Sequence, residues 1–201
     1  MIGKVSFCGF EAEQEGVLPD NFPETIEFIG DSITEGVLVD EEYKADSSDQ
    51  PNRVYQDDVT ATYAYKTAQA LNLKPTIMGY GATGITCAGQ GAVPRVREGY
   101  PFYYHNAPIE NNKADYIVIN HRTNDGRATA EEYILEMEEF LKLVRKMNLY
   151  VLFLNLTKKY KDSVLVIDSK GWLPKLPVHP GRDGHMVAAE KLIEILNVWV
   201  S

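Results

Sequence analysis

A chain of 201 residues is long enough for one sizeable domain, and a second independent hydrophobic core is not expected. Its 20 basic and 29 acidic residues give a net charge of −9, and no cluster of Lys and Arg is available to neutralise a nucleic-acid backbone, which argues against nucleic acid as a partner. The two cysteines, Cys8 and Cys87, exclude a disulfide framework or a zinc site built on C-x-x-C pairs, and no apolar run is long enough to span a bilayer.

The beginning of the chain lacks the uninterrupted apolar core of a signal peptide, because acidic residues follow closely in MIGKVSFCGFEAEQEG. We therefore expect a soluble protein of the cytoplasm. This expectation does not hold if the sequence is a piece of a longer protein, for which an extracellular location is the alternative. Residues 1–22 are predicted to be an extension or linker, and residues 23–201 to form a single domain.

Five short apolar runs rich in β-branched and aromatic residues predict strands. They begin at Thr25 (TIEFIG), Pro75 (PTIMGY), Asp115 (DYIVIN), Leu149 (LYVLFLN) and Ser163 (SVLVID). Each run is continuously apolar rather than alternating, which is typical of strands that are covered on both faces. The polar stretch 37–60 and the glycine-, proline- and aromatic-rich stretch 86–112 are predicted to be loops.

Helical patterns lie between or after the apolar runs. They cover TYAYKTAQALNL (62–73), EEYILEMEEFLKLVRKM (131–147) and GHMVAAEKLIEILNVWV (184–200), and Thr129 with Glu132 predicts a capping box ahead of the second. The buried stripe of that second helix is predicted to consist of Ile134, Met137, Leu141 and Val144. Strands that alternate with helices predict an α/β fold with a mostly parallel sheet, whose active site lies at the carboxyl ends of the strands.

The first predicted strand runs into a candidate nucleophile. Gly30 permits a sharp turn, and Asp31 and Ser32 follow where a helix should begin. A helix N-terminus leaves backbone N–H groups unpaired and carries partial positive charge, so it stabilises an oxygen that becomes negative. Ser32 is therefore a candidate nucleophile, although the same residues are also typical of a simple N-cap.

Polar residues that suit a hydrolytic site also follow the third strand and precede the last helix. Asn124 could donate its amide to a developing oxyanion without adding a charge, although TNDG is also a common turn sequence. Pro180 restricts His179 to an extended conformation, which suits a general base that must meet a serine from a distant strand. For His185 we expect a packed or surface position.

The segment GYGATG (79–84) matches the G-x-G-x-x-G pattern of dinucleotide-binding loops. Further glycines and prolines follow it, so the long helix that such a loop should open is not predicted. We expect the glycines instead to present a backbone N–H to the same oxyanion. A nucleotide-binding module stays an alternative that rests on these glycines alone.

Taken together and in this order, the blocks FIGDSITEG, GYGATG, RTND and HPGRDGH resemble the SGNH hydrolases, also called GDSL-type lipases and esterases, from about Thr25 to the C-terminus. The resemblance implies a three-layer α/β/α, flavodoxin-like fold with a mostly parallel five-stranded sheet. It also implies ester hydrolysis through an acyl-serine, with no cofactor or metal. By this resemblance Ser32 is the nucleophile and His179 the base, while the N–H groups of Ser32 and Gly81 and the amide of Asn124 bind the oxyanion.

The chain departs from the family pattern at two positions. Leu176 stands three residues before His179, where the family usually has the aspartate that orients the imidazole. In this the chain is similar to family-two carbohydrate esterases, some of which use a backbone carbonyl instead, and a Ser-His dyad is predicted, with Asp168 or Asp183 as substitutes. Arg122 replaces a glycine, and it is expected either to contact an anionic or polyhydroxyl substrate or to turn outward and pair with acids.

The aromatic residues of the loops favour a saccharide ester as the substrate, because sugar rings pack on aromatic faces beside a polar site. Packing at the edge of the core is the alternative. The predicted substrate-binding residues are Asp31, Arg122, Tyr103 and Trp172. The predicted activity is hydrolysis of a short-chain ester, most simply an acetyl ester. The alternatives are a lysophospholipase or thioesterase of the same fold, or a catalytically impaired binding module, and no oligomeric state is predicted.

Overall fold

The computed structural model describes residues 22, 24–40, 56–109, 113–148, 152–154, 165–173 and 177–200, with the backbone alone for 152–154. Four strands in it form one parallel sheet in the order β2-β1-β5-β6. They are β1 (Thr25–Gly30), β2 (Lys74–Gly79), β5 (Tyr116–Asn120) and β6 (Leu152–Leu154). The register places Gly30 beside both Gly79 and Asn120, so the carboxyl ends of three strands meet at one edge.

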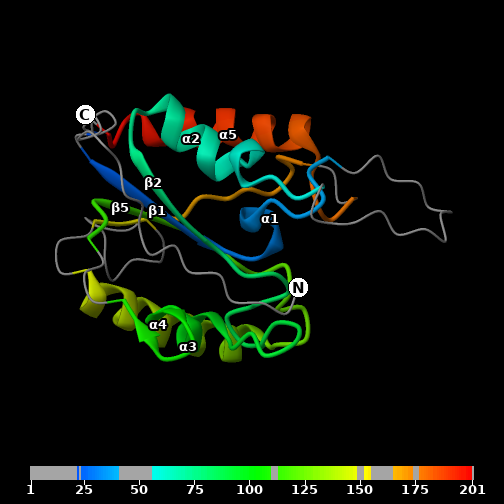
Figure 1. Ribbon diagram of the computed structural model, residues 1–201, viewed down its shortest axis with the longest axis vertical. Coiled ribbons are helices and arrows are strands. Elements are labelled where there is room, and N and C mark those ends of the chain that lie inside the picture. The colour runs from blue at the N-terminus through cyan, green and yellow to red at the C-terminus, as the bar shows by residue number, and fades with distance from the viewer. Residues whose placement is uncertain are drawn as a thin grey trace, which may run out of the picture.

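Helices cover both faces of this sheet, which confirms the predicted three-layer α/β/α fold (Figure 1). One face carries α2 (Tyr63–Ala70) and α5 (Arg182–Leu196), and the other carries α3 (Val96–Gly99) and α4 (Ala130–Met147). The short helix α1 (Ser32–Glu35) lies at the carboxyl end of β1. Of the fifth predicted strand, residues 165–168 are described and have no strand pairing, while 163–164 lie outside the described residues.

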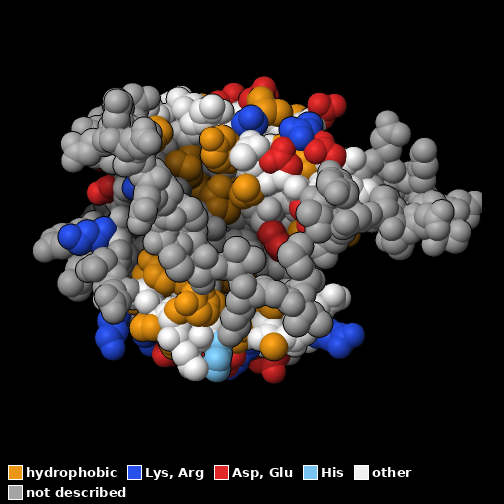
Figure 2. Space-filling model, viewed as in Figure 1, with side chains coloured by type: hydrophobic (Ala, Val, Ile, Leu, Met, Phe, Trp, Pro, Cys, Tyr) orange, Lys and Arg blue, Asp and Glu red, His pale blue; other side chains and the backbone are white. Residues whose placement is uncertain are grey.

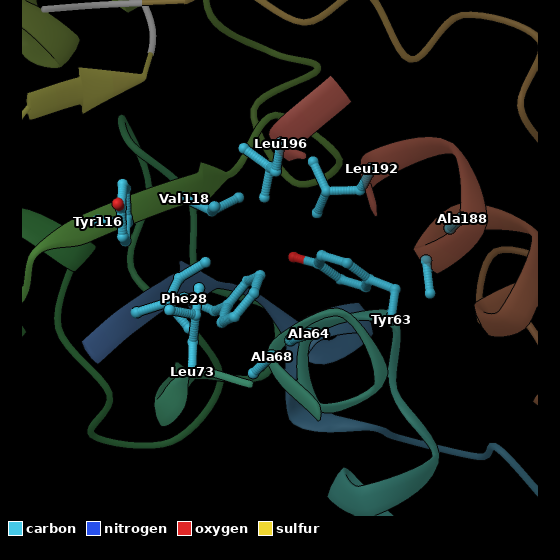
Figure 3. Close-up of a cluster of buried hydrophobic side chains, with 12 residues drawn as sticks. Phe28, Tyr63, Ala64, Ala68, Leu73, Tyr116, Val118, Ala188, Leu192 and Leu196 are labelled. Carbon is cyan, nitrogen blue, oxygen red and sulfur yellow. The ribbon is translucent and has the colours of Figure 1, made fainter. Parts of the chain in front are cut away.

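The buried apolar side chains form two clusters, one on each side of the sheet. The first joins the sheet to α2 and α5 and includes Phe28, Tyr63, Val118 and Leu192, as Figure 3 shows. The second joins the sheet to α4 and includes Ile29, Ile117, Phe140 and Val144. Burying each large apolar side chain contributes roughly 1.5–3 kcal/mol, so both faces of the sheet are needed to stabilise the domain.

The long helix α4 begins with the predicted capping box, in which Thr129 and Glu132 bond each other's backbone N–H. Its predicted stripe is partly wrong, because Ile134 is 50% exposed and Phe140 is fully buried instead. The buried face runs through Met137, Phe140 and Val144. These positions are three and four residues apart. Ile134 is three residues before Met137, but it lies about 120° of helical rotation from Phe140 and about 80° from Val144, so it falls off the centre of the buried face.

The two predicted loops contain short regular elements. The first includes a 3-10 helix, η2 (Val59–Ala61), and its residues 41–55 lie outside the described residues. The second includes α3 and a hairpin of β3 (Phe102–Tyr104) and β4 (Ala107–Pro108). Residues 1–21 also lie outside the described part of the chain, so the predicted extension stays a prediction.

A buried carboxylate anchors the start of this hairpin. The Tyr100 hydroxyl donates to Oε2 of Glu27 in β1 over 2.7 Å, and Nδ2 of Asn148, at the end of α4, donates to the Tyr100 oxygen over 2.8 Å. Within the described ranges, no helix is both long and apolar enough to cross a bilayer. Figure 2 shows basic and acidic side chains interspersed on the described surface of the face viewed in Figure 1.

Candidate active site

Ser32 is the first residue of α1 and is 8% exposed. Asp31 caps this helix, because its Oδ1 accepts a hydrogen bond from the Ile33 N–H over 3.0 Å. Gly30 leaves room for the close approach of this helix, since a Cβ there would lie 2.1 Å from Oγ1 of Thr34. Ser32 is therefore held at the carboxyl end of the central strand, where the Thr34 side chain packs on the bare backbone of Gly30.

His179 reaches this serine from the segment that precedes α5. Its Nε2 lies 2.9 Å from Oγ of Ser32, a hydrogen-bonding distance across 147 positions of sequence. The structure thus brings together the two residues that the resemblance gives as nucleophile and base. Leu176 lies outside the described residues. Asp168 accepts a hydrogen bond from the Lys170 N–H, and Asp183 is exposed in the first turn of α5.

Asn124 joins three strand ends. Its Nδ2 donates to the Thr83 carbonyl over 3.0 Å and to Oδ2 of Asp31 over 3.3 Å. The amide therefore lies between the loop after β2 and the start of α1. Asp31 is only 1% exposed, and this burial raises the pKa of its carboxyl group.

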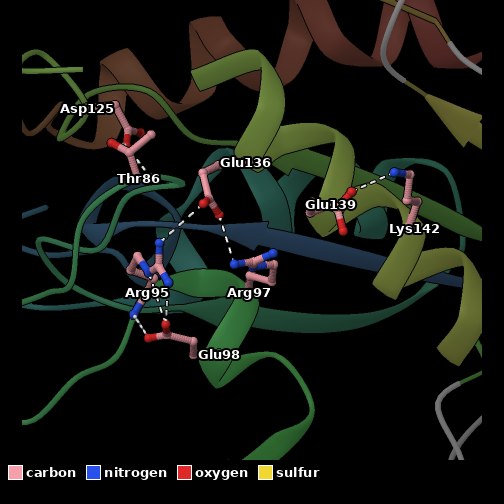
Figure 4. Close-up of polar contacts among 8 residues, drawn as sticks. All are labelled: Thr86, Arg95, Arg97, Glu98, Asp125, Glu136, Glu139 and Lys142. Atoms are coloured by element: carbon pink, nitrogen blue, oxygen red, sulfur yellow. Dashed lines mark hydrogen bonds and ion pairs between the residues drawn. The ribbon is translucent and has the colours of Figure 1, made fainter. Parts of the chain in front are cut away.

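Asp125 organises the loop that follows β2, a role that sequence reasoning missed. Its carboxylate accepts hydrogen bonds from the backbone N–H of Ile85 (3.1 Å) and from both the N–H and the hydroxyl of Thr86 (2.7 Å each). Figure 4 shows Asp125 facing Thr86. The available signal was a carboxylate directly after Asn124, but its burial to 4% exposure depends on the tertiary fold.

The three glycines of GYGATG let this loop approach α1 and Asp125 closely. A Cβ on Gly79 would lie 2.4 Å from the Glu35 backbone nitrogen, and one on Gly84 would lie 2.5 Å from Oδ1 of Asp125. At Gly81 a Cβ would lie 3.0 Å from Oε2 of Glu35. The next helix, α3, has only four residues. The glycines thus serve close packing, and no phosphate-binding helix follows them.

The N–H groups of Ser32 and Gly81, the remaining predicted oxyanion donors, make no hydrogen bond to another described residue. Both therefore keep a donor available at the site. By contrast, both hydrogens of the Asn124 amide have acceptors, so one of these contacts must open before the amide can donate to a substrate.

Arg122 was predicted either to contact the substrate or to turn outward and pair with acids. It is exposed, but it contacts an aromatic ring instead of an acid. Its guanidinium carbon lies 5.1 Å from the ring centroid of Tyr133 in α4, a cation–π contact rather than an ion pair. Its φ is +146°, a value that favours glycine, the residue that the family usually has here. The side chain itself is exposed.

Of the two predicted aromatic contacts, Trp172 packs against the first apolar cluster, as the alternative of packing at the edge of the core predicts, and Tyr103 does not contact the site. Trp172 lines a cavity of about 280 Å³ together with Ile33, Thr123 and Pro180, which neighbour Ser32, Asn124 and His179 in sequence. Tyr103 is 66% exposed on the β3–β4 hairpin, and no hydrogen bond or ring contact joins it to the site within the described ranges.

His185 stabilises the start of α5 from inside. Its Nδ1 accepts a hydrogen bond from the Tyr63 N–H over 3.1 Å, and its ring stacks on that of Tyr63. The residue is 1% exposed, in line with the packed position expected for it. Burial, and then the nearby His179, lower the pKa of His185 to about 4, so it is neutral at pH 7. No group of three or more His, Cys, Asp or Glu residues in the described ranges is arranged to hold a metal ion.

Solved structures that share this fold include carbohydrate esterases and a protein described as a GDSL-like lipase. A family two carbohydrate esterase from Clostridium thermocellum, solved with cellohexaose, has a TM-score of 0.67 and 22% identity over 90% of this chain and 66% of its own. An acetyl xylan esterase from Butyrivibrio proteoclasticus has a TM-score of 0.71 and 21% identity over 94% of this chain and 68% of its own. A protein described as a GDSL-like lipase from Bacteroides uniformis has a TM-score of 0.54 and 13% identity over 87% of this chain and 96% of its own.

The likeness at these identities establishes the fold alone. The chain spans only about two thirds of the length of the two esterase chains. No protein-family model matches it, and no curated protein matches it in sequence. The chain therefore has the fold of the SGNH hydrolases, as the sequence resemblance predicts, and within that fold it is similar to the family two carbohydrate esterases.

Proposed function

We propose that this chain is a serine esterase that hydrolyses a short-chain acyl ester, an acetyl ester of a saccharide, through an acyl-Ser32 intermediate. The observation that carries the proposal is the 2.9 Å distance between Nε2 of His179 and Oγ of Ser32. A serine becomes nucleophilic when a base within hydrogen-bond reach accepts its proton, and this pair meets that condition.

The reaction proceeds in two steps. Oγ of Ser32 attacks the ester carbonyl while Nε2 of His179 takes the hydroxyl proton, and the imidazolium then returns this proton to the leaving alcohol. Water, activated by the same histidine, next attacks the acyl-serine and releases the acid. The tetrahedral oxyanion of each step accepts hydrogen bonds from the N–H groups of Ser32 and Gly81 and from the Asn124 amide, which gives up its bond to Asp31.

The saccharide part of the proposal rests on the surroundings of Ser32. Trp172 lines a cavity together with Ile33 and Pro180, the chain neighbours of Ser32 and His179, and an aromatic ring next to polar groups suits the C–H face of a sugar. Carbohydrate esterases are also among the structures that share the fold. A thioesterase or lysophospholipase stays an alternative within the same chemistry.

Labelling with a fluorophosphonate probe tests the nucleophile, with peptide mass mapping to locate it. We expect the probe on Ser32, and we expect acetate release from p-nitrophenyl acetate to be lost in Ser32→Ala and His179→Ala. His105→Ala is the matched control for the second variant, because His105 is an exposed residue of the β3–β4 hairpin. Well-folded wild type that neither reacts with the probe nor releases acetate would contradict the proposal and favour the binding module.

The substrate class needs a separate comparison. We expect faster acetate release from acetylated xylo-oligosaccharides than from p-nitrophenyl acetate at equal concentration, and a steep loss of rate from p-nitrophenyl acetate to the octanoate. Trp172→Ala should raise KM for the oligosaccharide and leave KM for p-nitrophenyl acetate nearly unchanged. Preference for an acyl thioester or a lysophospholipid would replace the saccharide ester as substrate while leaving the Ser32 chemistry in place.

A further inference from the structure

Arg182, the first residue of α5, binds two carboxylates that come from elsewhere in the chain. Its Nε lies 2.5 Å from Oδ1 of Asp40, and its Nη2 lies 2.7 Å from Oδ2 of Asp40 and 2.9 Å from Oδ2 of Asp58. The contact with Asp40 is bidentate, which fixes an arginine in direction as well as in distance. The Arg182 contact lowers the pKa of Asp40, and Thr60 and then Arg182 lower that of Asp58, so both are ionised at neutral pH.

Both carboxylates belong to backbone that is bonded to the segment of the nucleophile. After α1, the Val37 N–H donates to the Ser32 carbonyl over 3.0 Å, and the buried residue Val39 leads directly to Asp40. The Asp58 N–H donates to the Gly36 carbonyl, also over 3.0 Å. Arg182 therefore connects the start of α5 to the chain that leaves Ser32.

The same arginine is three residues from His179. Gly181, between them, lies against this segment, since a Cβ on it would be 3.6 Å from the Val39 carbonyl oxygen. His185, in the first turn of α5, reaches the nucleophile's helix only indirectly: it bonds to the Tyr63 N–H of α2, and the Tyr63 hydroxyl lies 2.8 Å from Oγ1 of Thr34 in α1. Position 176, where the family usually carries the orienting aspartate, is leucine here. Where α5 begins relative to residues 36–40 is therefore one determinant of the placement of the imidazole over Ser32.

We propose that Arg182 is a positioning residue: its contacts with Asp40 and Asp58 set the distance between Nε2 of His179 and Oγ of Ser32. This inference rests on the proposed function. The Arg182 side chain is 53% exposed, and exposed ion pairs contribute only about 0–1 kcal/mol to stability. A displacement of about 1 Å at reacting groups can nevertheless cost on the order of 100-fold in rate. The rate should therefore depend on Arg182 far more than the stability does.

The test compares Arg182→Gln, Arg182→Lys and Asp40→Asn with wild type on p-nitrophenyl acetate. We expect Arg182→Gln to lower kcat by roughly 10- to 100-fold with KM almost unchanged. Arg182→Lys should retain part of the rate, because lysine keeps the positive charge but cannot make the bidentate contact with Asp40. The matched control is Arg95→Gln. Arg95 also contacts two carboxylates, Glu98 and Glu136, but it joins α3 to α4 (Figure 4).

A pH profile separates positioning from a direct effect of charge. Arg182→Gln removes a positive charge and Asp40→Asn removes a negative one, so a field acting on His179 would shift the pKa seen in kcat/KM in opposite directions. His185, which lies near this histidine, and Asp58, the second carboxylate on Arg182, are the same in both variants. Positioning predicts that both variants lower kcat, whereas opposite pKa shifts with kcat preserved would overturn it.

The outcomes of this test are distinct from those of the proposed function. An active wild type whose Arg182→Gln variant keeps its kcat overturns the positioning role and leaves the esterase intact. If wild type is inactive, the esterase fails, and crystal structures of wild type and Arg182→Gln decide the inference instead. A longer distance between Nε2 of His179 and Oγ of Ser32 in the variant supports it, and an unchanged distance overturns it.

Discussion

At Arg122, a favourable contact with an aromatic ring is opposed by a backbone conformation that residues with a side chain disfavour. The φ of +146° at Arg122 is one that glycine adopts freely, and a side chain there costs on the order of 1–3 kcal/mol. The contact of the guanidinium with the Tyr133 ring returns about 0.5–1 kcal/mol at an exposed site. Arginine at this position is therefore expected to cost stability, even though it makes a favourable contact.

Two substitutions separate these contributions. Arg122→Ala loses the aromatic contact and keeps the disfavoured φ, so we expect its free energy of unfolding to fall by about 0.5–1 kcal/mol. Arg122→Gly loses the same contact but relieves the backbone, so it should be more stable than the alanine variant by about 1–2 kcal/mol. Urea unfolding followed by circular dichroism measures both. Equal stabilities of the two variants would show that the backbone at this position is not strained.

At the scale of elements, the packing of β2 against α1 decides whether the site can form. The carboxyl end of β2 approaches the backbone of α1 so closely that a Cβ on Gly79 would lie 2.4 Å from the Glu35 nitrogen. Backbone cannot move aside as a side-chain tip can, so any side chain at this position must push the loop of residues 79–84 away from Ser32.

Gly79→Ala should therefore destabilise the fold and impair the site together. We expect a loss of about 2–3 kcal/mol in the free energy of unfolding and a marked loss of labelling at Ser32 by a fluorophosphonate probe. Gly126→Ala is the matched control, since a Cβ there would meet nothing within 4 Å. A fully stable and reactive Gly79→Ala variant would contradict the packing role of this glycine.

The strands and the start of α4 could be predicted from the sequence alone, because each is marked by a pattern within a few neighbouring residues. The apolar runs at Thr25, Pro75 and Asp115 are strands, and the capping box at Thr129 begins α4, because strand and cap preferences act over a few residues. The buried face of α4 was only partly predicted. Whether Ile134 or Phe140 is buried depends on how the helix docks on the sheet, which periodicity alone does not determine.

In the site, too, residues marked by local motifs were predicted, and residues whose role depends on tertiary contacts were missed. Ser32, His179 and Asn124 were predicted from motifs, and the structure brings the first two within 2.9 Å. Asp125 and Arg182 were missed, because their partners Thr86, Asp40 and Asp58 lie at least 39 positions away in sequence. Contacts of this kind exist only once the strands have assembled, so no local pattern records them.

For the whole molecule, two histidines with buried ring nitrogens, His121 and His185, make stability depend on pH. Burial lowers the pKa of both His121 and His185 to about 4, from the usual 6.5. The folded state therefore favours the neutral rings, while the unfolded chain takes up protons as soon as the pH falls below about 6.5. Stability is fully present above this pH and is lost as the pH falls from about 6.5 to about 4. Asp31, whose pKa burial raises, offsets part of this loss.

We expect the free energy of unfolding to fall from pH 7.5 to pH 5.0 by on the order of 2 kcal/mol for each histidine. Urea unfolding at the two pH values measures the fall. His185→Gln should be less stable than wild type at pH 7.5, because Tyr63 loses its ring acceptor, but its stability should fall only about half as much on acidification. His105→Ala, at an exposed position, should behave as wild type. If His185→Gln loses as much stability as wild type between the two pH values, His185 is not the group whose protonation opposes folding.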